Sequence, residues 1–101
     1  MPYVAIGDGN GVVTTNHGCD SATTTKECSQ KVFIGGVGVV LMGHKNTSHT
    51  YPVGNSCPNH QVSLSTGSDK VFVENKQLGR ENDFYSEEKI TSAGQTKVNA
   101  G

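Results

Sequence analysis

Histidine and cysteine side chains gather in one short stretch of this chain. The thirteen residues from Ser48 to His60, SHTYPVGNSCPNH, hold two of the four histidines and one of the three cysteines. The stretch has no helical or strand-like periodicity, and Pro58 and Asn59 are typical turn residues. Imidazole and thiolate groups are the ligands of tetrahedral structural zinc sites. The stretch is therefore either a polar surface loop or one half of a metal site.

Four residues are the candidate metal ligands. Cys57 and His60 form a Cys-x-x-His pair, a spacing that a turn can close around one ion. His49 lies eight residues before Cys57, and His17 would be a remote ligand that ties the N-terminal part of the chain to this local group. In the alternative interpretation, these side chains are simply solvated.

The other two cysteines have competing interpretations. Cys19 could replace Cys57 as a ligand, or it could be a small buried residue. Cys28 precedes a predicted strand and is expected to pack against it. A Cys19–Cys28 disulfide is possible, but the chain opens without a signal peptide, so we expect synthesis in the cytoplasm and reduced thiols.

Composition predicts one small domain with a modest core. The chain has 101 residues, of which 33% are hydrophobic and 17% charged, and its net charge is −1. A domain of this size often needs a disulfide, a metal or a partner chain for stability. The low net charge argues against disorder, and it gives no reason to expect a nucleic acid or an anionic membrane as a binding partner.

Strands are predicted along most of the chain, and helices nowhere with any strength. The segment 32–42, VFIGGVGVVLM, is β-branched and interrupted by glycines, which is typical of short buried strands. Acidic residues in the segment 81–88, ENDFYSEE, predict a solvated turn. The side chains expected to fill the core are Val32, Ile34, Val71 and Val73.

An internal repeat organises these strands. The segments 29–36, SQKVFIGG, and 68–75, SDKVFVEN, share Ser, Lys, Val and Phe at matching positions, and 94–101, GQTKVNAG, is a degraded third copy. Matching positions, such as Val32, Val71 and Val98, lie 39 and then 27 residues apart, so the extra length of the first interval includes the histidine-rich stretch. Repeats this short cannot bury an apolar face alone and must pack against each other.

With these repeats the chain resembles the PAAR-repeat family, the tip proteins of type VI secretion and contractile phage tail spikes. The segment 66–83, TGSDKVFVENKQLGREND, is the clearest match, and 5–19, AIGDGNGVVTTNHGC, resembles the opening Gly-Asp and His-Gly elements of the family. The Pro-Ala-Ala-Arg signature itself is absent. His44 stands where the family has Asp, and FYSEEK (84–89) replaces its third-repeat Cys-Gly.

The resemblance implies an all-β fold, a small conical domain of three short β repeats with pseudo-threefold symmetry. Residues 1–101 would form this single domain. The family holds zinc or iron near the apex, usually through three histidines and one cysteine. The corresponding ligands here would be His17, His49, Cys57 and His60, with Cys57 replacing the missing third-repeat cysteine. His44, at the position of an aspartate in a turn, is expected to support that turn, and the alternative is that it replaces His49 as a ligand.

The function implied by the resemblance is mechanical and non-enzymatic. The chain would cap and sharpen a trimeric β-helical spike protein (VgrG-like or a phage tail spike), which would bind the base of the cone. It would contact a target membrane transiently at a virion or secretion-apparatus tip, with no nucleic acid and no homo-oligomer expected. The sequence does not distinguish a phage from a bacterial secretion system.

Two other functions remain open at this level. A small metal-dependent enzyme or toxin would need a water-accessible position on the metal, and a metal-free β-rich binding module would need no ion. Four candidate protein ligands, with no carboxylate between Glu27 and Asp69, favour a closed structural site. Metal binding would then add folding free energy on the order of 10 kcal/mol.

Overall fold

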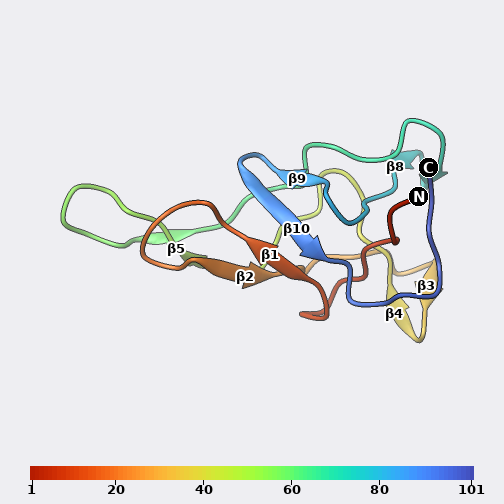
Figure 1. The fold of residues 1–101 in the computed structure, drawn as a ribbon, viewed down its shortest axis with the longest axis horizontal. Helices are drawn as coiled ribbons and strands as arrows, with labels where there is room; N and C mark the ends of the chain where they lie inside the picture. Colours follow the sequence, from red (N-terminus) through yellow and green to blue (C-terminus); the bar gives the residue numbers. More distant parts are fainter.

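Short strands and turns make up the whole molecule. A computed structural model describes residues 1–101 and contains ten strands and no helix, which confirms the all-β prediction. Accordingly, the chain has no helix long and apolar enough to cross a membrane. The molecule is elongated, with principal extents of 41 × 24 × 22 Å (Figure 1).

The ten strands form one antiparallel sheet and three separate hairpins. The four-stranded sheet has the order β2-β1-β10-β9, and residues far apart in sequence therefore pair in it. Its strands are β1 (Val12–Thr14), β2 (Ala22–Thr24), β9 (Phe84–Tyr85) and β10 (Glu88–Ser92). The hairpins pair β3 (Phe33–Ile34) with β4 (Val37–Gly38), β5 (His49–Thr50) with β6 (Asn59–His60), and β7 (Phe72–Val73) with β8 (Lys76–Gln77).

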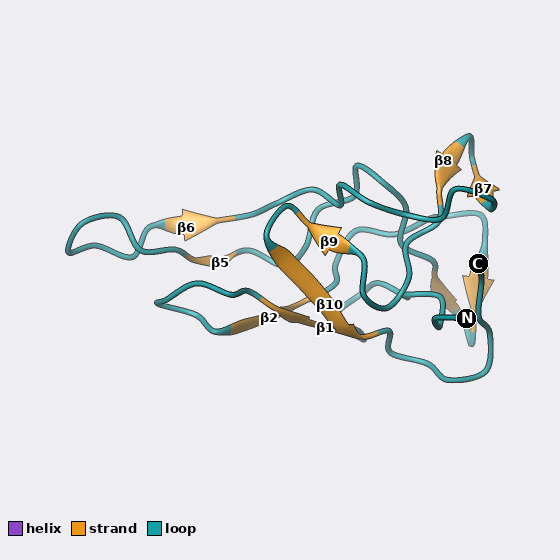
Figure 2. Ribbon diagram, turned by 45° about the horizontal axis from the view of Figure 1, so that its top comes forward, coloured by secondary structure: helices purple, strands orange, loops and turns teal.

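These elements divide the molecule into two ends. The β3–β4 and β7–β8 hairpins lie with both chain termini at one end, which we call the terminus end (Figures 1 and 2). The β5–β6 hairpin extends in the opposite direction, and its connecting loop, residues 51–58, forms what we call the loop end.

The first two repeat copies form hairpins with the same turn. In the β3–β4 turn Gly35 and Gly36 have φ values of +60° and +83°, and in the β7–β8 turn Glu74 and Asn75 have +55° and +64°. Two consecutive residues with positive φ are typical of a type I′ turn, whose twist suits a two-residue hairpin. One backbone geometry is therefore made by Gly-Gly in one copy and by Glu-Asn in the other.

A side-chain hydrogen-bond pattern recurs in all three copies. The Ser29 hydroxyl accepts bonds from the backbone N–H groups two and three residues later, at 3.0 and 3.1 Å. Ser68 accepts the equivalent pair at 3.1 and 2.9 Å. Gln95 accepts it through its amide oxygen at 2.8 and 2.9 Å. These acceptors keep the 39- and 27-residue intervals of the repeat, so the third copy is more regular in structure than in sequence.

Three backbone segments close a ring of hydrogen bonds in the interior. Ala5 N–H donates to the Gly79 carbonyl at 3.0 Å, Gly79 N–H to the Val40 carbonyl at 2.8 Å, and Val40 N–H to the Ala5 carbonyl at 2.9 Å. A Cβ atom at Gly79 would lie 2.8 Å from Leu64 Cδ2 and 3.0 Å from the Val40 carbonyl oxygen. The close approach of the three segments therefore requires glycine at this position.

Two apolar clusters surround these segments. The predicted core residues Ile34, Val71 and Val73 are only half-buried and pack against the second cluster, whereas Val32 is 41% exposed, so its assignment to the core was wrong. Hairpins of two-residue strands leave one side of each strand to solvent. The first cluster comprises Ala5, Val13, Val40, Leu64, Tyr85, Ile90 and Ala93, and the second Val4, Val39, Leu41, Leu78 and Ala100.

The hydroxyl group of Tyr85 is a polar group without a partner in the apolar core. Its side chain is fully buried, and its hydroxyl oxygen has no hydrogen-bond partner. Burial raises the pKa of Tyr85 well above its ordinary value. We expect Tyr85→Phe to leave the free energy of unfolding unchanged or raise it by about 1 kcal/mol, because the substitution removes an unsatisfied polar group. Urea unfolding would measure this.

A substitution in the same cluster provides the contrast. Ile90→Ala should lower the free energy of unfolding by about 2–4 kcal/mol, since it leaves a cavity in the core. A destabilisation of similar size in Tyr85→Phe would show that the hydroxyl is hydrogen-bonded after all.

Candidate metal centre

The β5–β6 hairpin brings two of the predicted ligands together. His49 in β5 and His60 in β6 are directly opposite each other in the antiparallel pair. Side chains of such a cross-strand pair lie on the same face of the hairpin, a few ångströms apart. The eleven-residue separation of these histidines in sequence therefore corresponds to one position in the ladder.

The central sheet brings His17 to a carboxylate that the sequence analysis missed. β1 pairs with β10, and the Thr14–Lys89 pair lies where β1 ends and β10 begins. His17 follows β1 in the β1–β2 turn, and Glu88 is the first residue of β10. The Asn16 side chain donates a hydrogen bond to the Glu87 carbonyl at 2.9 Å, which holds the turn beside the start of β10.

The three histidines converge on a single oxygen of Glu88. The Nε2 atoms of His17, His49 and His60 lie 2.6, 2.8 and 3.0 Å from Glu88 Oε2. All four ligand atoms lie within 4.8 Å of one another. The Glu88 side chain is fully buried, those of His17 and His49 are nearly so, and that of His60 is 26% exposed. These four residues, the His/Glu group, could hold a metal ion.

Hydrogen bonds at the far side of two rings determine which nitrogen carries the proton. His17 Nδ1 lies 2.9 Å from the Gly18 carbonyl oxygen, and His49 Nδ1 lies 2.8 Å from the Thr47 carbonyl oxygen. Because a carbonyl oxygen only accepts, each Nδ1 must donate, and Nε2 of each neutral ring carries a lone pair. Both lone pairs face a carboxylate oxygen, an arrangement that becomes favourable when a proton or a cation lies between them. Backbone carbonyls orient metal-binding histidines in the same way.

Asn46 orients the carboxylate. Its side chain is fully buried, and its amide nitrogen donates to Glu88 Oε1 at 2.8 Å. Its amide oxygen accepts a bond from Val62 N–H at 3.1 Å, which fixes the orientation of the amide. With Oε1 engaged by Asn46, only Oε2 faces the histidines, so Glu88 would offer an ion one oxygen rather than two.

Charge coupling within the group shifts two pKa values in opposite directions. Burial acts to lower the pKa of His17, but the hydrogen bonds to the Gly18 carbonyl and to Glu88 raise it overall. Burial acts to raise the pKa of Glu88, but the hydrogen bonds from His49, His17 and Asn46 lower it overall. The metal-free group is therefore stabilised as a charged carboxylate with a protonated imidazole.

Tyr51 covers the outer side of the group. Its ring stacks on His60 with the centroids 4.6 Å apart, and meets His17 edge-on at 4.8 Å. The His17 and His49 rings are themselves nearly parallel, with centroids 5.3 Å apart. Aromatic contacts thus keep the three imidazoles in place from the side that faces the loop end.

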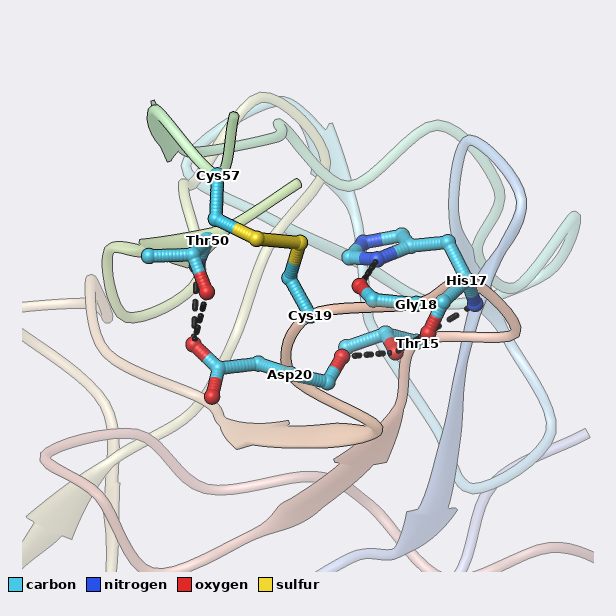
Figure 3. The surroundings of a disulfide bond; sticks show 7 residues. All are labelled: Thr15, His17, Gly18, Cys19, Asp20, Thr50 and Cys57. Carbon is cyan, nitrogen blue, oxygen red and sulfur yellow. Dashed lines mark hydrogen bonds between the residues drawn. A yellow bond between two sulfur atoms is a disulfide. The ribbon is translucent and has the colours of Figure 1, made fainter. Parts of the chain in front are cut away.

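The prediction of Cys57 as a ligand is corrected by the structure. Cys57 forms a disulfide with Cys19, with the two Cα atoms 6.0 Å apart, so neither sulfur is a free thiolate (Figure 3). The expectation of three reduced thiols is wrong for the same reason, and the possible Cys19–Cys28 bond is not formed. Cross-linking residues 38 positions apart constrains the unfolded chain, and this is worth about 4 kcal/mol of stability in the chain-entropy model.

Two further expectations concern residues outside the group. His44 Nδ1 accepts a hydrogen bond from Leu41 N–H at 3.0 Å, and Asp83 accepts the same bond from Arg80 N–H at 2.8 Å. His44 therefore supports its turn as predicted, and its burial and the nearby Lys76 lower its pKa. Cys28 is a half-buried free thiol next to Gly7 and Gly38, consistent with the packing role expected for it.

Glu88 could not be found by inspecting the histidine-rich stretch. The prediction of a solvated turn at 81–88 was wrong for this residue, because its side chain has no exposed surface. One signal did exist: Glu88 lies in the segment 84–89, FYSEEK, at the position where the resemblance described in the sequence analysis led us to expect a cysteine ligand. In the His/Glu group, the Glu88 carboxylate is present in place of the predicted Cys57 thiolate.

The donor set suits a first-row divalent cation. Imidazole nitrogen and carboxylate oxygen bind such ions at about 2.0–2.2 Å, which places neighbouring ligand atoms of a tetrahedral site about 3.3 Å apart. The Nε2–Oε2 separations of 2.6–3.0 Å are slightly shorter, so small outward side-chain rotations would make room for an ion.

Comparison of the sequence with known protein families and with curated proteins finds no match.

We expect Glu88→Gln to weaken binding of a divalent metal by more than about 100-fold, because even changes outside the ligand shell cost 10–100-fold. The amide keeps the shape of the side chain but removes the anionic ligand. The loss would be measured by chelator competition and by elemental analysis of the purified protein.

His44→Ala is the matched control, because it removes the one histidine that lies outside the His/Glu group. Metal content should remain at one ion per chain in this variant. Equal metal loss in both variants, or an unchanged melting temperature when chelator is added to the native protein, would contradict the assignment.

The metal-free protein should be most stable in mild acid. The lowered pKa of Glu88 stabilises the fold above its ordinary value of 4.5, and this contribution is lost as pH falls. The raised pKa of His17 stabilises the fold below its ordinary value of 6.5, and this contribution is lost as pH rises. Thermal unfolding in chelator should therefore show a maximum between these values.

Metal-loaded protein should behave differently, because protons compete with the ion for imidazole nitrogen. Its melting temperature should continue to rise towards neutral pH. Parallel pH profiles with and without metal would exclude the His/Glu group as the binding site.

Proposed function

We propose that this chain is a non-enzymatic tip protein that caps and sharpens the trimeric spike of a contractile injection machine, a phage tail or a type VI secretion system. The observation that carries the proposal is the threefold recurrence of its hydrogen bonds, with the His/Glu group far from the end where the repeat hairpins lie. A chain with three equivalent segments can match the end of a three-chain spike.

The backbone pairing supports a body of three repeats. Ala5, Val40 and Gly79 occupy equivalent places in the hydrogen-bond ring, and each donates to the segment before it in the cycle. Three isolated bridges have the same cyclic order: Ile6 with Val39, Leu41 with Leu78, and Val4 with Arg80. We infer that the N-terminal segment completes the third repeat, which gives a conical body with a pseudo-threefold axis.

The terminus end has the properties of a docking face for the spike. Phe33 in the first hairpin and Phe72 in the second are both more than half exposed, and Val98 of the third copy is 43% exposed. One apolar side chain from each repeat copy would suit the threefold end of a β-helical trimer (VgrG-like or a phage tail spike). Exposed strand edges in the hairpins could extend its last strands.

The loop end would form the apex, stiffened by an ion. With four protein donors the site would have the closed shell of a structural metal centre, which would leave no position for a reacting water on a tetrahedral ion. Zinc fits the nitrogen and oxygen donors best, and iron is the alternative. Glu88 would replace the cysteine that the PAAR-repeat family usually has at this site.

The chemistry of the apex suits a mechanical role. Residues 52–59 are all exposed, so the loop end gains little from apolar burial. An ion and a disulfide are cross-links that need no core. They would keep the apex rigid during its transient contact with a target membrane, at the tip of a virion tail or a secretion apparatus.

The docking face is tested with the trimeric β-helical spike protein of a contractile injection machine. We expect one chain to bind one trimer, and Phe72→Asp to abolish binding because it places a charge in the apolar contact. Val53→Asp is the matched control, since Val53 has the same 56% exposure but lies in the loop of the opposite end. Size-exclusion chromatography with light scattering would report the stoichiometry.

A folded native chain that binds no spike trimer would refute the proposed function. Loss of binding in Val53→Asp with retention in Phe72→Asp would reverse the assignment of base and apex.

A further inference from the structure

The disulfide and the His/Glu group join the same two segments of the chain. Cys19 follows His17 by two residues in the β1–β2 turn, and Cys57 precedes His60 by three residues at the end of the β5–β6 loop. Figure 3 shows the cystine spanning the gap between these segments, beside His17. One link is covalent and depends on redox conditions, and the other depends on a metal ion.

Few other interactions connect these two segments. Backbone hydrogen bonds of the loop stay within its own hairpin, from Tyr51 N–H to the Pro58 carbonyl and between Val53 and Ser56. The Asp20 carboxylate accepts two bonds from Thr50, its backbone N–H and its hydroxyl, both at 2.8 Å. Residues 52–58 of the loop are exposed, and its Tyr51 ring meets His17 of the β1–β2 turn edge-on, with the centroids 4.8 Å apart.

We propose that the two links are coupled: bound metal promotes formation of the Cys19–Cys57 disulfide, and the disulfide then slows release of the metal. This inference rests on the metal site proposed above. In the reduced chain, an ion held by His17 and His60 fixes both segments and brings Cys19 and Cys57 to the 6.0 Å Cα separation that a disulfide requires. Once formed, the disulfide holds His17 against the hairpin, so the ion cannot leave by separation of the two segments.

The redox step balances with a small-molecule disulfide as oxidant. One cysteine thiolate attacks the oxidant, forms a mixed disulfide and releases one thiol. The second thiolate attacks that mixed disulfide, forms the Cys19–Cys57 bond and releases the second thiol. Two protein thiols lose two electrons and two protons, and the oxidant gains them. Both cysteines are exposed, so oxidants and reductants of small size have access.

Thermodynamic linkage makes the coupling reciprocal. If the disulfide raises the affinity for metal, bound metal must favour the disulfide by the same factor. A tip protein made in a reducing compartment would then acquire its ion first. Exposure to oxidising surroundings would add the covalent link without any rearrangement of the apex.

Two rates test the inference, measured on the native protein and on Cys28→Ser, which removes the only other thiol. The first is the rate of Cys19–Cys57 formation in glutathione disulfide, with and without zinc. The second is the rate of zinc transfer to a chromogenic chelator from oxidised and from reduced protein. We expect zinc to accelerate disulfide formation, and the disulfide to slow zinc release, each by about tenfold or more.

A variant separates the disulfide from other effects of reductant. Cys19→Ser in the Cys28→Ser background cannot form the bond, and it should release zinc at the rate of the reduced protein under all conditions. Reversible reduction of the native chain gives the same comparison without a substitution that could impair folding.

Three results would overturn the coupling. Equal zinc-release rates in the two redox states would refute it while leaving the metal site intact. Tighter binding on reduction, with near-ultraviolet thiolate-to-cobalt charge-transfer absorption in the cobalt(II)-substituted protein, would show that a thiolate becomes a ligand and the disulfide competes with the ion. Absence of metal binding in either state would refute both this inference and the metal site.

Discussion

The buried carboxylate of Glu88 is the constraint on which the rest of this structure depends. A charged group without solvent exposure is costly unless every lone pair is compensated. Asn46 occupies one oxygen, and three imidazole nitrogens surround the other. Two of these rings donate hydrogen bonds through Nδ1–H to backbone carbonyls, so Nε2 of each neutral ring carries a lone pair. The positive charge that balances the carboxylate must therefore come from a proton or a cation between the Nε2 atoms and Glu88 Oε2. The fold at the loop end is therefore organised around a place for positive charge.

The four members of the group come from three separate segments. His49 and His60 come from opposite strands of one hairpin, and Glu88 from the first position of β10. His17 reaches the group because β1 and β10, far apart in sequence, are neighbours in the sheet. A site assembled from three separate segments links the β5–β6 hairpin to the central sheet. Binding of a cation there would consequently be coupled to folding at this end.

The two ends of the molecule are stabilised by different kinds of interaction. Towards the terminus end, backbone segments interlock through the ring of Ala5, Val40 and Gly79, with apolar side chains packed around it. Towards the loop end, the chain has cross-links in place of a core: the Cys19–Cys57 bond and the His/Glu group. In the proposed role this division is useful, because an apex narrow enough to penetrate has too little volume for a hydrophobic interior.

The sequence by itself determined the all-β class, the repeat intervals and the pairing of His49 with His60, because each depends on local spacing. Turn chemistry at His44 was also predictable, since its hydrogen bond spans only three residues. Only the tertiary structure identified Glu88 as the fourth member of the His/Glu group. Glu88 is separated from His17 by 71 residues, and its neighbours in sequence are typical of an exposed turn.

The disulfide partner of Cys57 was likewise identified only by the tertiary structure. Its spacing to His60 is compatible with a metal ligand, but spacing along the chain carries no information about Cys19, which lies 38 residues away across the fold. Only strand pairing brings the β1–β2 turn beside the β5–β6 loop. Local patterns thus determined which residue types were available for chemistry, and long-range packing determined which of them meet, because burial and cross-linking depend on distance in space.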